Sequence, residues 1–127
     1  MHTLKLLERS FGICKLPAAT TIPAWACDGF FSATSTESEL SIVCEECQIP
    51  DNIERESDWR CLKVVGQLSF DLVGVVAKLT SCLAVANISV FVISTYNTDY
   101  CLVKEEYLDL AVETLKQSGY HFDDHSP

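Results

Sequence analysis

The fold is decided by residues 59–122, WRCLKVVGQLSFDLVGVVAKLTSCLAVANISVFVISTYNTDYCLVKEEYLDLAVETLKQSGYHF. Runs of β-branched and aromatic residues alternate with runs whose apolar residues recur every three or four positions, the patterns of strands and amphipathic helices. We expect strands at 59–66, 88–95, 100–104 and 120–122, and helices at 72–86 and 105–119. The order βαββαβ is that of a ferredoxin-like module, with both helices on one face of an antiparallel sheet. The sequence therefore predicts an α+β fold.

The two predicted helices carry recognisable ends. The core face of the first is expected to hold Val73, Val76, Leu79 (or Thr80) and Leu83. Ser69 and Asp71 precede this helix as candidate N-caps, and Asn87 suits its C-terminal turn. The second helix begins with two acids, which complement the helix dipole, and ends in Gly119.

The first half of the chain repeats this pattern in a shorter form. We expect strands at 4–7 and 11–17 around a polar turn, a short helix or 3₁₀ turn at 22–29, and a hairpin of strands 30–35 and 40–46. FFSATSTESELSIVCEE (30–46) parallels VFVISTYNTDYCLVKEE (90–106), because in each a strand, a polar turn with an acid, an apolar strand and a Glu-Glu helix start follow one another. Two ferredoxin-like modules are therefore expected, the first abbreviated. Their boundaries are predicted at 1–56 and 57–122, with a flexible tail at 123–127.

The composition argues against two classes of partner. The chain has 127 residues, 48% of them hydrophobic, and a formal net charge of −9. An acidic surface repels phosphate backbones, so no nucleic-acid partner is expected. Residues 79–98 are uncharged and have about the length of a bilayer span. Asparagine, serine and threonine side chains in their second half would have to enter hydrocarbon, so no membrane association is expected.

The seven cysteines are expected to be reduced, which predicts a cytoplasmic protein. Their number is odd, and the N-terminal residues MHTLKLLERSFG lack the apolar core of a signal peptide. Four of them lie inside strand-like runs, where a free cysteine behaves as a small buried hydrophobe. These are Cys14, Cys44, Cys61 and Cys101.

Residues with catalytic or metal-binding spacing are few. Cys44 and Cys47 form a CxxC pair, but structural zinc takes four ligands, and His2, His121 and His125 lie near the chain ends. The two glutamates between the cysteines should raise the thiol pKa, the opposite of what redox chemistry needs. There is no nucleophile elbow, internal histidine or phosphate-binding loop. We expect no enzyme activity, no cofactor and no metal.

One polar constellation indicates a small-molecule site. The first N–H groups of the helix near residues 70–75 have no partner inside the helix and can hold an anion, and Gly74 allows close approach. Residues 94–99, STYNTD, form a polar break between two apolar strands. An α-amino acid would place its carboxylate on the helix N–H groups and its ammonium on Asp99, with Thr95 contributing. The alternative is that Ser69 or Asp71 caps the helix and 96–99 is an ordinary hairpin turn.

The same motifs carry a resemblance to a known family. DLVGVVAKL (71–79), ANISVFVIST (86–95) and YNTDYCLVK (96–104), together with IPAWACDGFFSATSTESELSIVCEE (22–46), resemble those of ACT domain proteins. The resemblance is to the small tandem-ACT type related to aspartate kinase regulatory domains and cytosolic arginine sensors. It implies two ACT modules, allosteric binding of small ligands, usually amino acids, and a homodimer formed through sheets or helices. Without a catalytic domain, such a protein would regulate another protein in trans or through ligand-sensitive association.

In this family the ligand lies between the helix start of one module and strand residues of another. The resemblance carries that role over to Phe70, Asp71, Leu72, Val73, Gly74, Thr95, Asn97, Thr98, Asp99, Ser41, Ile42 and Val43. Where the arginine sensors carry an acid just after the glycine, this chain has the apolar and then basic run VVAK (75–78), which argues against arginine itself. The alternative function is a ligand-free scaffold whose ACT-like surfaces mediate only dimerisation or docking.

Overall fold

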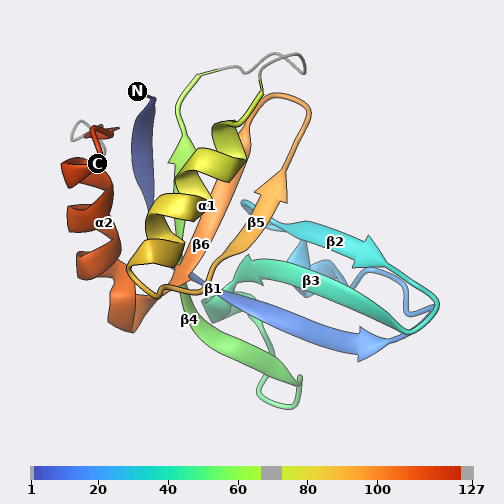
Figure 1. Cartoon of the computed structure of the whole chain (residues 1–127). Coiled ribbons are helices and arrows are strands. Elements are labelled where there is room, and N and C mark those ends of the chain that lie inside the picture. The colour runs from blue at the N-terminus through green and yellow to red at the C-terminus, as the bar shows by residue number, and fades with distance from the viewer. Residues whose placement is uncertain (1, 67–72, 124–127) are drawn as a thin grey trace. The chain divides into compact units, whose positions relative to one another are not determined.

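The computed structural model describes residues 2–66 and 73–123, and the chain divides into two compact units. Unit 1 comprises Met1–Glu8 and Arg60–Pro127, and unit 2 comprises Arg9–Trp59. Strands β1 (Thr3–Pro17) and β4 (Arg55–Val64) contribute residues to both units (Figure 1). The domain boundaries at 1–56 and 57–122 stay predictions.

The strands of unit 1 follow the order β7-β1-β4-β6-β5. Strands β5 (Phe91–Ser94) and β6 (Asp99–Lys104) pair in antiparallel fashion, whereas β7 (His121–Phe122) pairs in parallel with the start of β1. The predicted closing edge strand is therefore confirmed, and its partner is the first strand of the chain. The sheet expected to be antiparallel in this part of the chain therefore includes a parallel pair, β7 with β1.

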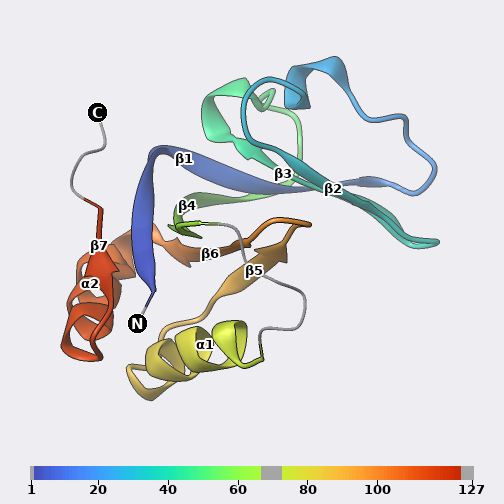
Figure 2. The same ribbon diagram turned by 90° about the horizontal axis from the view of Figure 1, so that it is seen from above.

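Two helices cover one face of this sheet. They are α1 (Val75–Val85) and α2 (Leu108–Gln117), and Figure 2 shows both on the same side of β4 and β6. Their apolar positions meet strand residues in a single buried cluster of Leu4, Leu62, Val64, Leu79, Leu83, Ile88, Cys101, Val103, Ala111, Leu115 and Tyr120. The helices predicted from three- and four-residue spacing are thus confirmed, and burial of this cluster supplies the main stabilisation of unit 1.

The helix starts lie a few residues later than predicted. Helix α1 begins at Val75 after Gly74, whose φ of 85° is left-handed, and Val73 is 92% exposed because it precedes the helix. Leu79 and Leu83 are buried as expected. Asn87, with φ 63°, follows the end of α1. The two acids expected at the second helix start lie in a 3₁₀ turn, η3 (Glu105–Tyr107), immediately before α2.

Unit 2 is a four-stranded sheet segment with the order β2-β3-β1-β4. Strand β3 (Glu39–Glu45) pairs antiparallel with β1 on one side and with β2 (Ser32–Ser35) on the other. Its described residues form 3₁₀ turns at η1 (Ala24–Ala26) and η2 (Glu46–Gln48) and no α-helix. The buried cluster consists of Cys14, Leu16, Ala26, Leu40, Ile42, Cys44 and Ile49.

The prediction of two strands at 4–7 and 11–17 separated by a turn is wrong. The chain forms one continuous strand, β1, from Thr3 to Pro17. The polar residues Glu8 and Arg9 are exposed within that strand. They mark a solvent-facing stretch of strand, which a single sequence does not distinguish from a turn.

The two similar sequence segments form hairpins with the same turn geometry. In unit 2, the N–H and the hydroxyl of Thr36 donate to Glu39 O at 2.9 and 3.2 Å. In unit 1, the N–H and the hydroxyl of Thr95 donate to Thr98 O at 2.9 and 3.1 Å. Each hairpin is followed by a 3₁₀ turn that begins with a glutamate, Glu46 or Glu105. The local repeat expected from the sequence is present in both hairpins.

Candidate ligand-binding site

The turn between β5 and β6 is closed by its own threonines. Besides the two bonds that Thr95 donates to Thr98 O, the N–H of Thr98 donates to Thr95 Oγ1 at 3.3 Å. These bonds fix the backbone of the turn. The Thr95 hydroxyl is already engaged within the turn as both donor and acceptor.

Thr98 is a buried anchor. Its side chain is 5% exposed, and its hydroxyl donates at 2.7 Å to the carbonyl oxygen of Val64, which is the last residue of β4. Because a buried carbonyl without a donor costs free energy, this bond holds the hairpin turn to the end of β4. The Thr98 hydroxyl has used its hydrogen in this contact, so it cannot donate to a ligand without breaking the bond.

Asp99 is the charged group of this turn. Ser94 and Asp99 are opposite each other in the β5/β6 pair, and Ser94 Oγ donates to Asp99 Oδ1 at 2.6 Å. A carboxylate has two acceptor oxygens, so Oδ2 can accept hydrogen bonds from a cationic group. Asn97 is exposed at the turn. The polar break thus presents one oriented carboxylate and one exposed amide.

The start of α1 lies at the same end of unit 1 as this turn, as Figure 1 shows. Lys78 N donates to Gly74 O at 2.9 Å, the first hydrogen bond of the helix. The N–H groups of the first helical turn have no partner within the helix, and the helix dipole makes this end attractive to anions. Phe70, Asp71 and Leu72 lie outside the described residues, as do the candidate caps Ser69 and Asp71.

The three predicted residues on β3 belong to unit 2. Ile42 is fully buried in the cluster of that unit, Val43 is 3% exposed and Ser41 is half-buried. Because β3 pairs with strands on both sides, the backbone groups of these residues are directed at β1 and β2. Their contact with a ligand stays a prediction.

The CxxC cysteines lie in different environments. Cys44 is buried, whereas Cys47 is exposed. The pKa of Cys44 is raised by its hydrogen bond with Cys14, by burial and, more weakly, by the charges of Cys47 and Glu45. The four strand cysteines Cys14, Cys44, Cys61 and Cys101 are buried, as predicted. Within residues 2–66 and 73–123, no three metal-ligating side chains gather.

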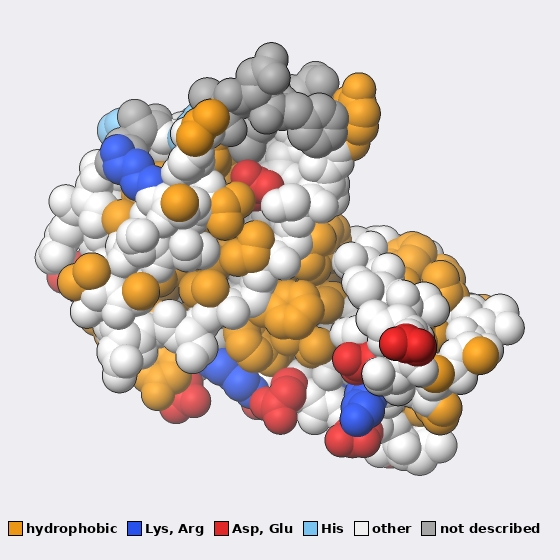
Figure 3. Space-filling model, turned by 45° about the vertical axis from the view of Figure 1, so that its right-hand side comes forward, with side chains coloured by type: hydrophobic (Ala, Val, Ile, Leu, Met, Phe, Trp, Pro, Cys, Tyr) orange, Lys and Arg blue, Asp and Glu red, His pale blue; other side chains and the backbone are white. Residues whose placement is uncertain are grey.

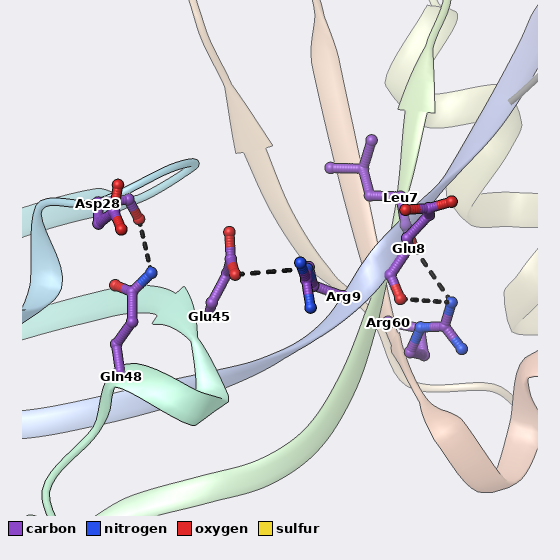
Figure 4. Close-up of polar contacts among 7 residues, drawn as sticks. All are labelled: Leu7, Glu8, Arg9, Asp28, Glu45, Gln48 and Arg60. Carbon is purple, nitrogen blue, oxygen red and sulfur yellow. Dashed lines mark hydrogen bonds and ion pairs between the residues drawn. The ribbon is translucent and has the colours of Figure 1, made fainter. Parts of the chain in front are cut away.

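Some polar contacts of each unit have no counterpart in the sequence pattern (Figure 4). In unit 1, Arg60 Nη2 donates to Leu7 O at 3.1 Å, and Arg60 Nη1 lies 3.6 Å from the Glu105 carboxylate. In unit 2, Gln48 donates to Asp28 O at 2.8 Å. Such contacts join residues 20 or more positions apart, so they depend on the tertiary structure and carry no spacing signal.

In Figure 3, the Lys and Arg side chains on the visible face lie apart from one another. No helix in the part of the chain that the structure describes has the length and apolar character of a membrane span.

The chain belongs to the ACT domain family. The family model described as an ACT domain matches residues 54–117, and a second model, described as an N-terminal domain, matches residues 9–52. Among named proteins, the cytosolic arginine sensor for mTORC1 subunit 1 from Homo sapiens is 33% identical over 108 residues, which cover 79% of this chain and 33% of the sensor. The chain therefore spans about a third of the length of the curated relatives it matches.

Solved structures show the same fold. A crystal structure of a protein from Agrobacterium tumefaciens is 38% identical with a TM-score of 0.91, and the match covers 98% of this chain and 95% of that one. The regulatory subunit of aspartate kinase from Thermus thermophilus has a TM-score of 0.63 at 11% identity, with coverage of 91% and 96%. At that identity, the second likeness concerns the fold alone. The resemblance to ACT domains seen in the sequence is confirmed.

Proposed function

We propose that this protein is a regulatory module that binds a small molecule, an α-amino acid, through unit 1, and that the chain comprises two ACT-like modules. The observation that carries the proposal is the position of Asp99. Its oriented carboxylate lies in a polar turn at the same end of unit 1 as the start of α1. The matching hairpin turns at Thr36 and Thr95 support the two-module arrangement. Two of the similar proteins, an arginine sensor and a regulatory subunit of aspartate kinase, support the class of function.

In this proposal, a side chain of the β5–β6 turn and the backbone at the start of α1 bind opposite charges of the ligand. The ammonium group binds Asp99 Oδ2 and the carboxylate binds the free N–H groups of the α1 start near Val73 and Gly74. Asn97 contributes its exposed amide. The contacts of Phe70, Asp71 and Leu72, which lie outside the described residues, are proposed from the family resemblance alone. Thr95 and Thr98 hold the turn in shape, because their hydroxyls are engaged internally.

A melting screen with each of the twenty amino acids tests the proposal. A ligand present at 100 times its Kd adds about 2.7 kcal/mol to the free energy of unfolding, a shift of several degrees for a chain of this size. We expect at least one amino acid to raise Tm at millimolar concentration. A melting midpoint that stays constant for all twenty would contradict amino-acid binding.

The proposed output is a change of association or of a partner's activity. We propose that the protein acts in the cytoplasm, without catalysis of its own, as a homodimer or on a regulated protein in trans. Light scattering with and without the amino acid that raises Tm measures the first of these outputs. A ligand-dependent change in mass would indicate ligand-sensitive association.

A ligand-free scaffold is the second candidate, and the exposed apolar side chains of unit 1 favour it. Val85 on α1 is 90% exposed and Leu110 on α2 is 48% exposed. Exposed apolar residues on helices are frequent at protein interfaces. A dimer whose mass does not change with any amino acid, together with a flat melting screen, would select this function over the first.

A further inference from the structure

Ser94 and Asp99 form a polar pair beside the turn of the β5/β6 hairpin. They are opposite each other in the strand register, and Ser94 Oγ donates to Asp99 Oδ1 at 2.6 Å. Ser94 is exposed and Asp99 is half-buried, so a molecule in solution can reach both side chains. Asp99 has no ion-pair partner among the residues that the structure describes. The pair therefore carries an uncompensated negative charge.

The hairpin does not need this pair in order to close. The equivalent hairpin of unit 2 has the same turn geometry, in which Thr36 donates to Glu39 O through its N–H and its hydroxyl. There Ser35 is opposite Leu40, which is 3% exposed in the buried cluster of that unit. A turn of this shape thus forms with leucine at the position that corresponds to Asp99. Turn formation alone does not account for the carboxylate in unit 1.

The pair offers acceptors and no donor. A serine hydroxyl has one hydrogen, and Ser94 donates it to Asp99, so Ser94 Oγ can only accept a further hydrogen bond. An ionised carboxylate also only accepts, and Asp99 Oδ2 is not used by Ser94. A primary ammonium group has three donors and no acceptor, whereas a hydroxyl group has a single donor. The pair is therefore complementary to an ammonium group.

We propose that Ser94 is a ligand-binding residue and that, with Asp99, it selects molecules that carry an α-ammonium group over their α-hydroxy counterparts. This inference rests on the proposed amino-acid binding by unit 1. One N–H of the ammonium donates to Asp99 Oδ2, and a second donates to Ser94 Oγ. Ser94 has a second effect, because its hydrogen bond fixes the orientation of the carboxylate.

Calorimetric titration with two matched molecules tests the proposal. They are the amino acid that gives the largest rise in Tm in the screen of twenty, and its α-hydroxy analogue. Wild type should bind the hydroxy analogue at least about tenfold more weakly, because the charge-assisted hydrogen bond to Asp99 is lost. Ser94→Ala should bind the amino acid about fivefold more weakly, as expected for the loss of one hydrogen bond. The affinity of Ser94→Ala for the hydroxy analogue should change little, because the single donor of that molecule serves Asp99.

Two further variants serve as controls. Ser94→Thr keeps the hydroxyl and should retain the wild-type preference for the amino acid. Ser35→Ala removes the equivalent exposed serine of unit 2 and should bind both molecules as wild type does. The Tm of each variant without added amino acid shows whether it folds.

The possible failures can be told apart. If Ser94→Ala binds the amino acid as tightly as wild type, or loses the same factor for both molecules, Ser94 does not receive the ammonium and the inference is overturned, while amino-acid binding itself stands. If wild type binds none of the twenty amino acids, the inference and the proposed function are both overturned.

Discussion

Thr98 Oγ1 donates a hydrogen bond of 2.7 Å to Val64 O, in a part of unit 1 where the Thr98 side chain is 5% exposed. This contact joins the hairpin that carries Asp99 to the end of the strand that precedes α1. It couples two segments 34 residues apart in the sequence, both of which flank the candidate site.

Replacing Thr98 with valine should therefore destabilise the protein. Valine has nearly the shape of threonine but no donor, so Val64 O loses this partner. We expect the free energy of unfolding to fall by about 1–3 kcal/mol, the typical cost of a buried polar group left unpaired. Urea unfolding measures it. The matched variant Thr98→Ser keeps the hydroxyl and should retain most of the stability that Thr98→Val loses. Equal stability of Thr98→Val and the wild type would show that the bond contributes nothing.

Asp99→Asn should abolish the effect of the amino acid that raises Tm without unfolding the protein. The substitution removes the negative charge that we propose binds the ligand ammonium, and a charge-assisted hydrogen bond contributes about 1.5–3 kcal/mol. Affinity measured by calorimetry should fall by about tenfold or more. Ser94→Ala removes only the donor to Asp99 Oδ1 and should have a smaller effect. Ligand binding by Asp99→Asn at the wild-type affinity would place the ammonium elsewhere.

Stability should decrease at alkaline pH because two buried thiols resist ionisation. Burial raises the pKa of Cys61 and of Cys101 to about 12. A thiol in the unfolded chain ionises near a pH of about 8.5. As pH rises, these thiols therefore lose their protons first in the unfolded state. Their contribution to the free energy of unfolding is complete below the pKa of the unfolded thiol. It is lost as pH rises toward their pKa in the folded state.

Urea unfolding between pH 8 and 11 checks this expectation. Each thiol should contribute a slope of about 1.4 kcal/mol per pH unit above the pH at which the unfolded thiol ionises. The variant Cys61→Ala/Cys101→Ala should show a shallower decline than wild type, whatever its stability at neutral pH. Identical slopes in the two proteins would mean that these thiols do not resist ionisation in the folded state.

Gly29→Ala should destabilise unit 2 through the backbone. Gly29 has φ 71°, and a Cβ atom there would lie 2.5 Å from Glu45 Oε2. The left-handed conformation costs about 1–2 kcal/mol for an ordinary residue. The glutamate end can swing aside, so the backbone accounts for most of the loss. Thermal melting should show a lower Tm for Gly29→Ala than for Gly29→Asn, since asparagine tolerates this conformation better; an alanine variant as stable as wild type would contradict the argument.

Much of the local structure follows from the residues themselves. The spacing of Leu79 and Leu83 placed them on the buried face of α1, and the β-branched runs located β5 and β6. Similar residue patterns at 30–46 and 90–106 produced the same threonine-closed turn. These features depend on neighbours within a few positions, which is the range over which helical and strand periodicity acts.

The candidate site was predicted only in part. Asp99 and Gly74 were chosen from a polar break and a helix start, and the β5–β6 turn and the start of α1 that hold them lie at one end of unit 1 (Figure 1). The anchoring role of Thr98 was not predicted, because its partner Val64 is 34 residues away. Ile42 is buried, as its apolar side chain predicts. Whether Ile42 contacts a ligand depends on tertiary contacts, which residue type does not encode.

The sequence by itself determined that this chain is an α+β protein of the ACT family, with helices α1 and α2 and hairpins at known positions. The tertiary structure decided that residues 3–17 form one strand, that β7 pairs with that strand, and that Cys14 and Cys44 lie in one buried cluster. The physical reason is the range of the interactions. Periodicity specifies which face of an element is buried, but strand register and neighbour order arise only when distant segments compete to pair.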